Sequence, residues 1–179
     1  MQTEIINLIF KDFQQHFKHF FDYCERGFTN ELIINMYARI YQPETTIVQY
    51  GQKFGEVFFI REGGVKLFNK FQIKDFMHLP QYSVFGDYQI ICDLKSNIVF
   101  QTAKLASDTR FMCVSKKVFL NLCELFPVTA ENLRHRALLR RLHFIQAMEK
   151  LDRVTSLKAL GRSFKKKFQQ KIQATIGRF

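Results

Sequence analysis

The sequence predicts a mainly β domain that is flanked by helices at both ends. From about residue 40 to residue 114, short β-branched or aromatic segments alternate with turn residues, whereas both ends carry apolar residues at helical spacing. The length of 179 residues suits one domain with helical extensions. Taken by themselves, the strand patterns leave a roll, a sandwich and a barrel open.

The N-terminal part predicts two helices. Apolar residues recur every three or four positions over residues 4–21, which indicates the first helix. Gly27 interrupts this pattern, and Thr29 offers an N-cap for a short second helix that runs through Met36.

The C-terminal part also predicts helices. Ser115 is a suitable N-cap for a helix that ends at Pro127. A longer helix is expected from about residue 129 to residue 151, with these residues on its apolar side: Leu133, Ala137, Leu138, Leu142, Ile145 and Met148. Its arginines are expected on a solvated face or against an acidic partner: Arg134, Arg136, Arg140 and Arg141.

Between the helices, six segments have the composition of strands and end near turn residues. They are residues 45–50, 57–60, 65–71, 76–79, 98–105 and 110–114. Gly51, Gly63 and Gly86 are expected to adopt positive φ angles at tight strand corners, because glycine has no Cβ to clash there.

Positive charge is concentrated near the C-terminus. The net charge is +11, and residues 153–179 contain eight lysines and arginines and no acidic residue. We expect this tail to be either an amphipathic helix that binds an anionic partner or a solvated segment. The partner-binding candidates in the tail are Arg162, Lys165, Lys166, Lys167 and Lys171.

Several classes of protein are disfavoured by the sequence. A Gly-rich phosphate loop with lysine, a nucleophile elbow and an H-E-x-x-H motif are all missing, so we expect no catalytic residues and no enzyme activity. The histidines are scattered, which predicts no metal site. No apolar run approaches the roughly 20 residues of a membrane span. The four cysteines form no C-x-x-C pair, which is typical of reduced thiols in an intracellular protein.

A family resemblance rests on five stretches that occur in order. Residues 41–51 resemble a Y-x-P-x-x-x-I-x-x-x-G strand, and residues 55–65 resemble a G-E-x-x-Y-F-I-x-x-G-x-V hairpin. Phe85-Gly86-Asp87 stands where an F-G-E triplet is expected, and residues 21–32 and 119–127 resemble the helices on either side. Together these stretches resemble the cyclic-nucleotide-binding domain of channels, kinases and bacterial regulators, in its channel-type form.

The resemblance implies a double-stranded β-helix, which is a jelly-roll-like β-roll, with N-terminal helices before it and C-terminal helices after it. It also implies a division of the chain into three parts. Residues 1–20 correspond to a linker-like N-terminal helix, residues 21–151 to the cyclic-nucleotide-binding-like domain, and residues 152–179 to the basic amphipathic tail.

The resemblance also implies a ligand pocket, but one with altered residues. In the family, the helix after F-G-E binds the cyclic phosphate, the Glu holds the ribose hydroxyl, and an Arg pairs with the phosphate. Here Asp87 replaces the Glu, and Ser96 is nearest to the position of the Arg. The loss of such a charged contact costs about 2–5 kcal/mol. The degenerate pocket comprises Gly86, Asp87, Tyr88, Lys95, Ser96 and Asn97, and we expect no bound cofactor.

The expected function is therefore that of a scaffold or interaction subunit in a larger assembly. The alternative is a cyclic-nucleotide-sensing regulatory module, bound to cAMP or cGMP, that is related to the cytoplasmic domain of ion channels. Candidate partners are proteins with acidic surfaces, such as tubulin in an axoneme, and anionic membrane surfaces. Too few residues follow Leu151 for a helix-turn-helix, which argues against nucleic acid. We expect an intracellular, cytoplasmic location that is cytoskeletal or ciliary, with the mitochondrion as an alternative.

Overall fold

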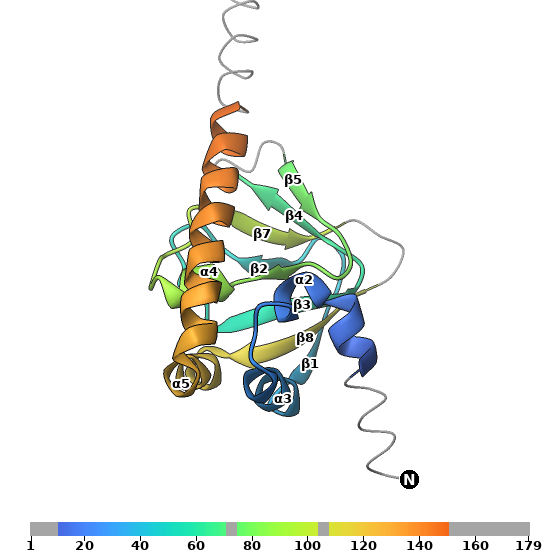
Figure 1. The fold of residues 1–179 in the computed structure, drawn as a ribbon. Helices are drawn as coiled ribbons and strands as arrows, with labels where there is room; N and C mark the ends of the chain where they lie inside the picture. The colour runs from blue at the N-terminus through green and yellow to red at the C-terminus, as the bar shows by residue number, and fades with distance from the viewer. Residues whose placement is uncertain (1–10, 71–74, 104–107, 151–179) are drawn as a thin grey trace, which may run out of the picture. The chain divides into compact units, whose positions relative to one another are not determined.

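The computed structural model describes residues 11–70, 75–103 and 108–150 (Figure 1). The chain divides into two units, residues 1–142 and 143–179. Within its described ranges, the first unit contains helices and two four-stranded antiparallel sheets. The second unit is described only over residues 143–150, which are helical.

The strands in the middle of the chain form two sheets. Neighbouring strands in both sheets are antiparallel. The first sheet has the order β1 (Tyr37–Tyr41), β8 (Thr109–Ser115), β3 (Glu56–Glu62) and β6 (Val84–Phe85). The second has the order β2 (Thr46–Val48), β7 (Val99–Thr102), β4 (Val65–Phe68) and β5 (Asp75–Leu79).

Helices precede and follow the strands, as predicted, and a short helix lies between two of the strands. The prediction of a mainly β domain is wrong in proportion, because more of the described residues are helical than lie in strands. Residues 11–16 are helical and lead into α2 (Lys18–Phe21) and α3 (Arg26–Ile34). The short α4 (Asp87–Ile91) lies between β6 and β7, and α5 (Lys116–Leu125) follows β8. A long helix then occupies residues 127–142 at the end of the first unit. None of the described helices has both the length and the apolar character that crossing a bilayer requires.

Aromatic rings join the sheets to each other and to the N-terminal helices. Phe85 of β6 stacks on Phe58 of β3 and on Phe100 of β7, with ring centroids 4.9 and 5.0 Å apart. The first sheet therefore contacts the second through stacked rings, at distances that favour aromatic pairs. On the other side of β3, Phe59 is surrounded by rings at 5.2–6.0 Å: Phe13, Phe17, Phe20 and Phe21.

The strand predictions are right in position but differ in extent. The six expected strands are all present, but β2, β4 and β7 are shorter than predicted over their described residues. The strands β1 and β6 were not predicted. All five residues of β1 are exposed or half-buried, so the strand lacks the alternation of apolar and polar residues that identifies a half-buried strand. Strand β6 has only two residues.

The predicted start of the second helix is wrong. Helix α3 begins at Arg26, with Glu25 at the N-cap position, and Gly27 and Thr29 both lie inside it. The Thr29 hydroxyl donates a hydrogen bond to the Glu25 carbonyl at 3.2 Å instead of capping the helix. Gly27 is required by packing, because a Cβ at that position would approach the Phe126 ring to 2.8 Å.

The predicted starts of both C-terminal helices and the end of α5 before Pro127 are confirmed, whereas the predicted end of the long helix near residue 151 lies outside the described residues. Part of the predicted apolar face is wrong. Ser115 caps α5 by accepting a hydrogen bond from Val118 N at 3.3 Å. In the long helix, Leu133 and Ala137 are buried, whereas Leu138 and Leu142 are 47% and 55% exposed. These two leucines lie outside the stripe of buried and half-buried residues on this helix, which consists of Thr129, Ala130, Leu133, Arg136, Ala137 and Arg140.

Candidate functional site

The predicted pocket begins where β6 turns into α4. Gly86 has a φ of 93° at this turn, and a Cβ there would lie 2.6 Å from the Glu56 carbonyl oxygen. Only glycine tolerates both conditions, so the close approach of Gly86 to β3 sets the direction in which α4 begins. Asp87 is the first residue of this helix, and its side chain is 0% exposed.

Arg140, from the long helix, binds the Asp87 carboxylate with both arms of its guanidinium. Arg140 Nη1 donates to Asp87 Oδ1 at 3.1 Å, and Arg140 Nη2 donates to Asp87 Oδ2. The two residues are 53 positions apart in the sequence. Such a two-pronged contact fixes the orientation of both groups as well as pairing their charges.

Burial affects this pair strongly. Burial lowers the pKa of Arg140, but the charge and the hydrogen bonds of Asp87 outweigh it and raise that pKa above its ordinary value. A fully buried carboxylate is costly to keep charged unless it is paired and hydrogen-bonded. Arg140 supplies both, so the Asp87 carboxylate is satisfied within the chain.

Further contacts hold the long helix against residues 19–25. The Thr129 hydroxyl accepts from Glu25 N and donates to Glu25 Oε2, both at 2.9 Å. Asn132 Nδ2 donates to the Tyr23 carbonyl at 3.3 Å. The Arg136 guanidinium lies 4.1 Å from the centroid of the Tyr23 ring and donates to the His19 carbonyl.

The expectation of a solvated arginine face is therefore wrong for two of the four arginines. Arg136 and Arg140 contact residues outside their own helix, whereas Arg134 pairs with Glu131 on the same helix. Their charges also act on His19, because partial burial and then Arg136 and Arg140 lower the pKa of its imidazole below 6.5. Sequence reasoning missed these roles, since the partners lie far away along the chain.

The second half of the predicted pocket, Lys95, Ser96 and Asn97, lies in a turn rather than at the start of α4. Ser96 is 3% exposed, and its hydroxyl donates to the Ile98 carbonyl at 2.6 Å and accepts from Ile98 N at 3.3 Å. Its backbone also pairs with Gly51 and Gln52. Ser96 therefore holds a turn together, and its hydroxyl is already engaged. Lys95 and Asn97 on either side are exposed.

Tyr88 is the third pocket residue on α4. Its side chain belongs to the core, with 4% exposure, and burial followed by the nearby Asp87 charge raises its pKa to about 12. The structure thus brings Gly86, Asp87 and Tyr88 together at the start of α4. The tail candidates Arg162, Lys165, Lys166, Lys167 and Lys171 lie outside the described residues.

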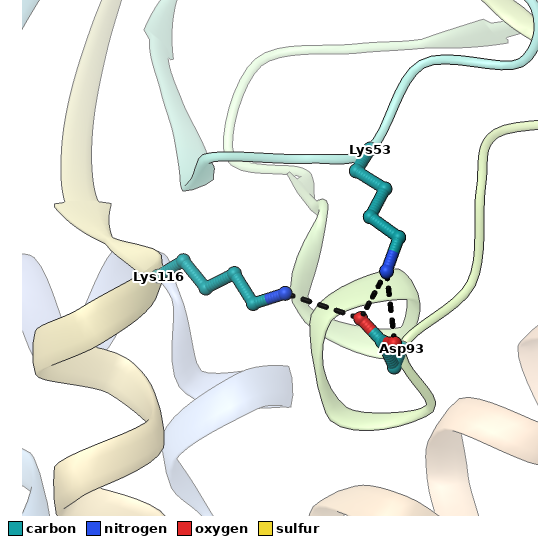
Figure 2. Close-up of polar contacts among 3 residues, drawn as sticks. All are labelled: Lys53, Asp93 and Lys116. Atoms are coloured by element: carbon teal, nitrogen blue, oxygen red, sulfur yellow. Dashed lines mark hydrogen bonds and ion pairs between the residues drawn. The ribbon is translucent and has the colours of Figure 1, made fainter.

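A second charged site surrounds Asp93, just after α4 (Figure 2). Lys53 Nζ lies 3.0 and 2.9 Å from the two carboxylate oxygens of Asp93, and Lys116 Nζ lies 3.2 Å from Asp93 Oδ1. The hydrogen bonds and charges of these lysines lower the pKa of Asp93 below its ordinary 3.8. Of this region, the sequence singled out only Lys95, which pairs with Lys53 in an isolated antiparallel bridge.

Compared with models of known protein families and with curated protein sequences, the chain matches none of them. In the described ranges, no group of three or more His, Cys, Asp or Glu side chains is arranged to hold a metal ion. The two charged sites around Asp87 and Asp93 are thus the features from which a function can be argued.

Proposed function

We propose that this chain is a non-enzymatic, cyclic-nucleotide-binding-like domain that serves as an interaction subunit of a larger assembly. In this proposal, its two sheets form the β-roll of that family, and its pocket does not bind cAMP or cGMP. The observation that carries the proposal is the pairing of Arg140 with Asp87.

Asp87 is the pocket residue that matters most for a nucleotide. The resemblance puts it where the family has the carboxylate that holds the ribose hydroxyl. A ribose hydroxyl is neutral and would give the Asp87 carboxylate one hydrogen bond, worth about 1.5–3 kcal/mol, per hydroxyl. Arg140 gives the carboxylate two hydrogen bonds and the opposite charge, so a ribose hydroxyl competes poorly with it.

The phosphate side of the pocket supports the same conclusion. No arginine occurs between Arg61 and Arg110, so the planar fork that suits a phosphate is not supplied from this segment. The Ser96 hydroxyl is engaged with Ile98, and Lys95 offers only a point charge. The stacked rings of Phe58, Phe85 and Phe100 fill space between the sheets.

The same contacts favour a scaffold over a sensor. A sensor of this family type needs a C-terminal helix that moves when the ligand binds. Here residues 129–140 are tied to Glu25, Tyr23 and Asp87 by hydrogen bonds and an ion pair within the chain, which oppose such a movement. The net charge of +11 suits partners with acidic surfaces, among which a cytoskeletal or ciliary protein remains our preferred class.

Calorimetric titration with cAMP and cGMP tests the proposal. The full chain is titrated beside Arg140→Ala, which frees Asp87, and Arg141→Ala, which removes the neighbouring charge and serves as the control. We expect wild type to bind either nucleotide no more tightly than about 1 mM, which is only about 4 kcal/mol.

Micromolar binding by the wild-type chain would contradict the proposal and favour the sensor. Binding that is gained in Arg140→Ala and not in Arg141→Ala would identify Arg140 as the group that closes the pocket. If neither variant binds, the engaged Ser96 and the aromatic packing suffice to exclude the nucleotide.

A further inference from the structure

Three lysines lie around Asp93 and form what we call the lysine cluster: Lys53, Lys95 and Lys116. Lys53 and Lys116 converge on Asp93 (Figure 2), whereas Lys95 is exposed and has no ion-pair partner among the described residues. Three lysines and one aspartate leave a surplus of two positive charges in the cluster.

Two of these lysines face each other across a bridge. Lys53 and Lys95 are directly opposed in an antiparallel pair, so their side chains project from the same face. Like charges in this position destabilise the pairing. Asp93 offsets the repulsion for Lys53, from which it lies 2.9 Å away, but Lys95 retains its charge without a partner.

The third lysine of the cluster, Lys116, lies at an electrostatically unfavourable position on a helix. It is the first residue of α5 and is followed by Lys117, and the first turn of α5 contains no acidic residue. The helix dipole is positive at this end, so it favours a nearby anion and disfavours cations. The lysine cluster thus combines two separate electrostatic costs that an added anion would relieve.

We propose that the lysine cluster is a docking site for an acidic segment of a partner protein, whose Asp or Glu carboxylates add to that of Asp93. This inference rests on the proposed function as an interaction subunit. Lys53 and Lys116 already hold a carboxylate at 2.9–3.2 Å, which demonstrates the chemistry that the site accepts. Each ammonium has three donors, so donors remain for a second carboxylate.

The group that the cluster already holds favours a carboxylate as its ligand. Lysine is a point charge that pairs with carboxylates and phosphates alike, so we infer the ligand from Asp93, whose carboxylate Lys53 and Lys116 contact at 2.9–3.2 Å. Asp93 is itself exposed, with a side chain that is 65% accessible, so a partner segment can reach the same lysines. Asp93 then acts as a resident competitor for them.

Binding of a fluorescent hexaglutamate peptide with blocked termini, measured by anisotropy on the full chain at low salt, tests this site. The double variant Lys53→Gln/Lys116→Gln is compared with Lys11→Gln/Lys18→Gln. The second pair is exposed on the N-terminal helices and lowers the net charge by the same two units. We expect the cluster variant to bind about 5-fold more weakly than this control, as two lost ion contacts allow.

A third variant should change the affinity in the opposite direction. Asp93→Asn removes the resident carboxylate, and asparagine tolerates the φ of 46° at this position. We expect this variant to bind hexaglutamate about 3-fold more tightly than wild type. If Asp93 served only to hold the lysines in place, its replacement would disorder them, and hexaglutamate would bind more weakly than to wild type.

Zero-length carbodiimide cross-linking of wild type to hexaglutamate provides a measurement that needs no variant. We expect adducts on at least one lysine of the cluster. The proposal is overturned if adducts form only on lysines beyond residue 150, or if the two double variants bind equally. It is also overturned if the binding of a single-stranded DNA oligomer of equal charge depends more strongly on Lys53 and Lys116 than the binding of hexaglutamate does.

These results are independent of the nucleotide titration. The titration concerns Asp87 and Arg140, whereas the peptide measurements concern lysines around Asp93. Failure of the docking site would therefore leave the closed pocket in place. Nucleotide binding by wild type would contradict the proposed function whether or not hexaglutamate binds.

Discussion

Cys113 shows how the chemistry of one residue follows from its position. All four cysteines lie in the described ranges, and none forms a disulfide. Cys113 is 0% exposed in β8, the strand between β1 and β3. Burial, followed by the charge of Glu56, raises the pKa of its thiol from 9.0 to about 12.

The Cys113 thiol should resist alkylation in the folded protein. The raised pKa reduces its thiolate fraction about a thousandfold, and the thiolate is the form that reacts. In maleimide labelling at about pH 8, read out by mass spectrometry of peptides, we expect Cys113 to react only after urea is added. Labelling of Cys113 in the folded protein at the rate seen in urea would contradict its burial.

His19 should make stability depend on pH. Its pKa is lowered below 6.5 in the folded chain, so below that pH the unfolded chain takes up this proton more readily. The stabilising contribution of neutral His19 is therefore full above pH 6.5 and is lost as the pH falls through the folded pKa. We expect urea unfolding between about pH 5 and 8 to show this loss in wild type and less of it in His19→Gln.

The Asp93 carboxyl does not interfere with this test. Its pKa is lowered from 3.8, so its contribution to stability is lost only at pH values below that window. Identical pH slopes for wild type and His19→Gln would show that His19 does not sense Arg136 and Arg140 in the folded chain.

Among the structural elements, the start of α4 depends on a single glycine. Gly86 and Gly51 both have strongly positive φ angles, 93° and 82°, but only Gly86 has a neighbour that a Cβ would strike. We expect Gly51→Ala to cost about 1–2 kcal/mol, the strain of the φ angle alone. Gly86→Ala should cost more, because the Cβ would also lie 2.6 Å from the Glu56 carbonyl oxygen.

Urea denaturation of the two variants checks this difference. The comparison is internally controlled, since both substitutions introduce the same side chain into the same backbone region. Equal losses of stability would mean that Gly86 is retained only for its φ angle, and that α4 can move away from β3 at little cost.

The elements with strong local signals could be predicted from the sequence. Ser115 and Pro127 mark the limits of α5 because capping and helix termination are decided within a few residues. Strand β1 could not be predicted, because an exposed edge strand carries no alternating pattern. Gly27 misled the prediction, since its place inside α3 is set by the distant Phe126 ring.

The candidate site was predictable only in part, for the same reason. Gly86, Asp87 and Tyr88 are adjacent in the sequence, and they lie together at the start of α4. The residue that decides their role, Arg140, is 53 positions from Asp87 and belongs to another helix. Lys53 and Lys116 likewise lie 40 and 23 positions from Asp93, so neither contact leaves a local pattern.

For the molecule as a whole, the two charged sites have different roles. The Asp87 carboxylate is buried and its charge is matched within the chain, whereas the lysine cluster is exposed and carries surplus charge. Under the proposed function, this organisation suits binding of acidic partners at the surface rather than of a nucleotide in the interior. The salt dependence of partner binding should be strong, because exposed charges are screened.

The proposed function depends on the Asp87–Arg140 pair, and a double-mutant cycle measures that pair most directly. Urea unfolding of wild type, Asp87→Asn, Arg140→Gln and the double variant gives their coupling energy. Arg141→Gln replaces Arg140→Gln in a control cycle. We predict a coupling of about 2 kcal/mol or more for Asp87 with Arg140, and about zero with Arg141. A coupling near zero for Asp87 with Arg140 would contradict the account, because Asp87 would then be available to a ligand.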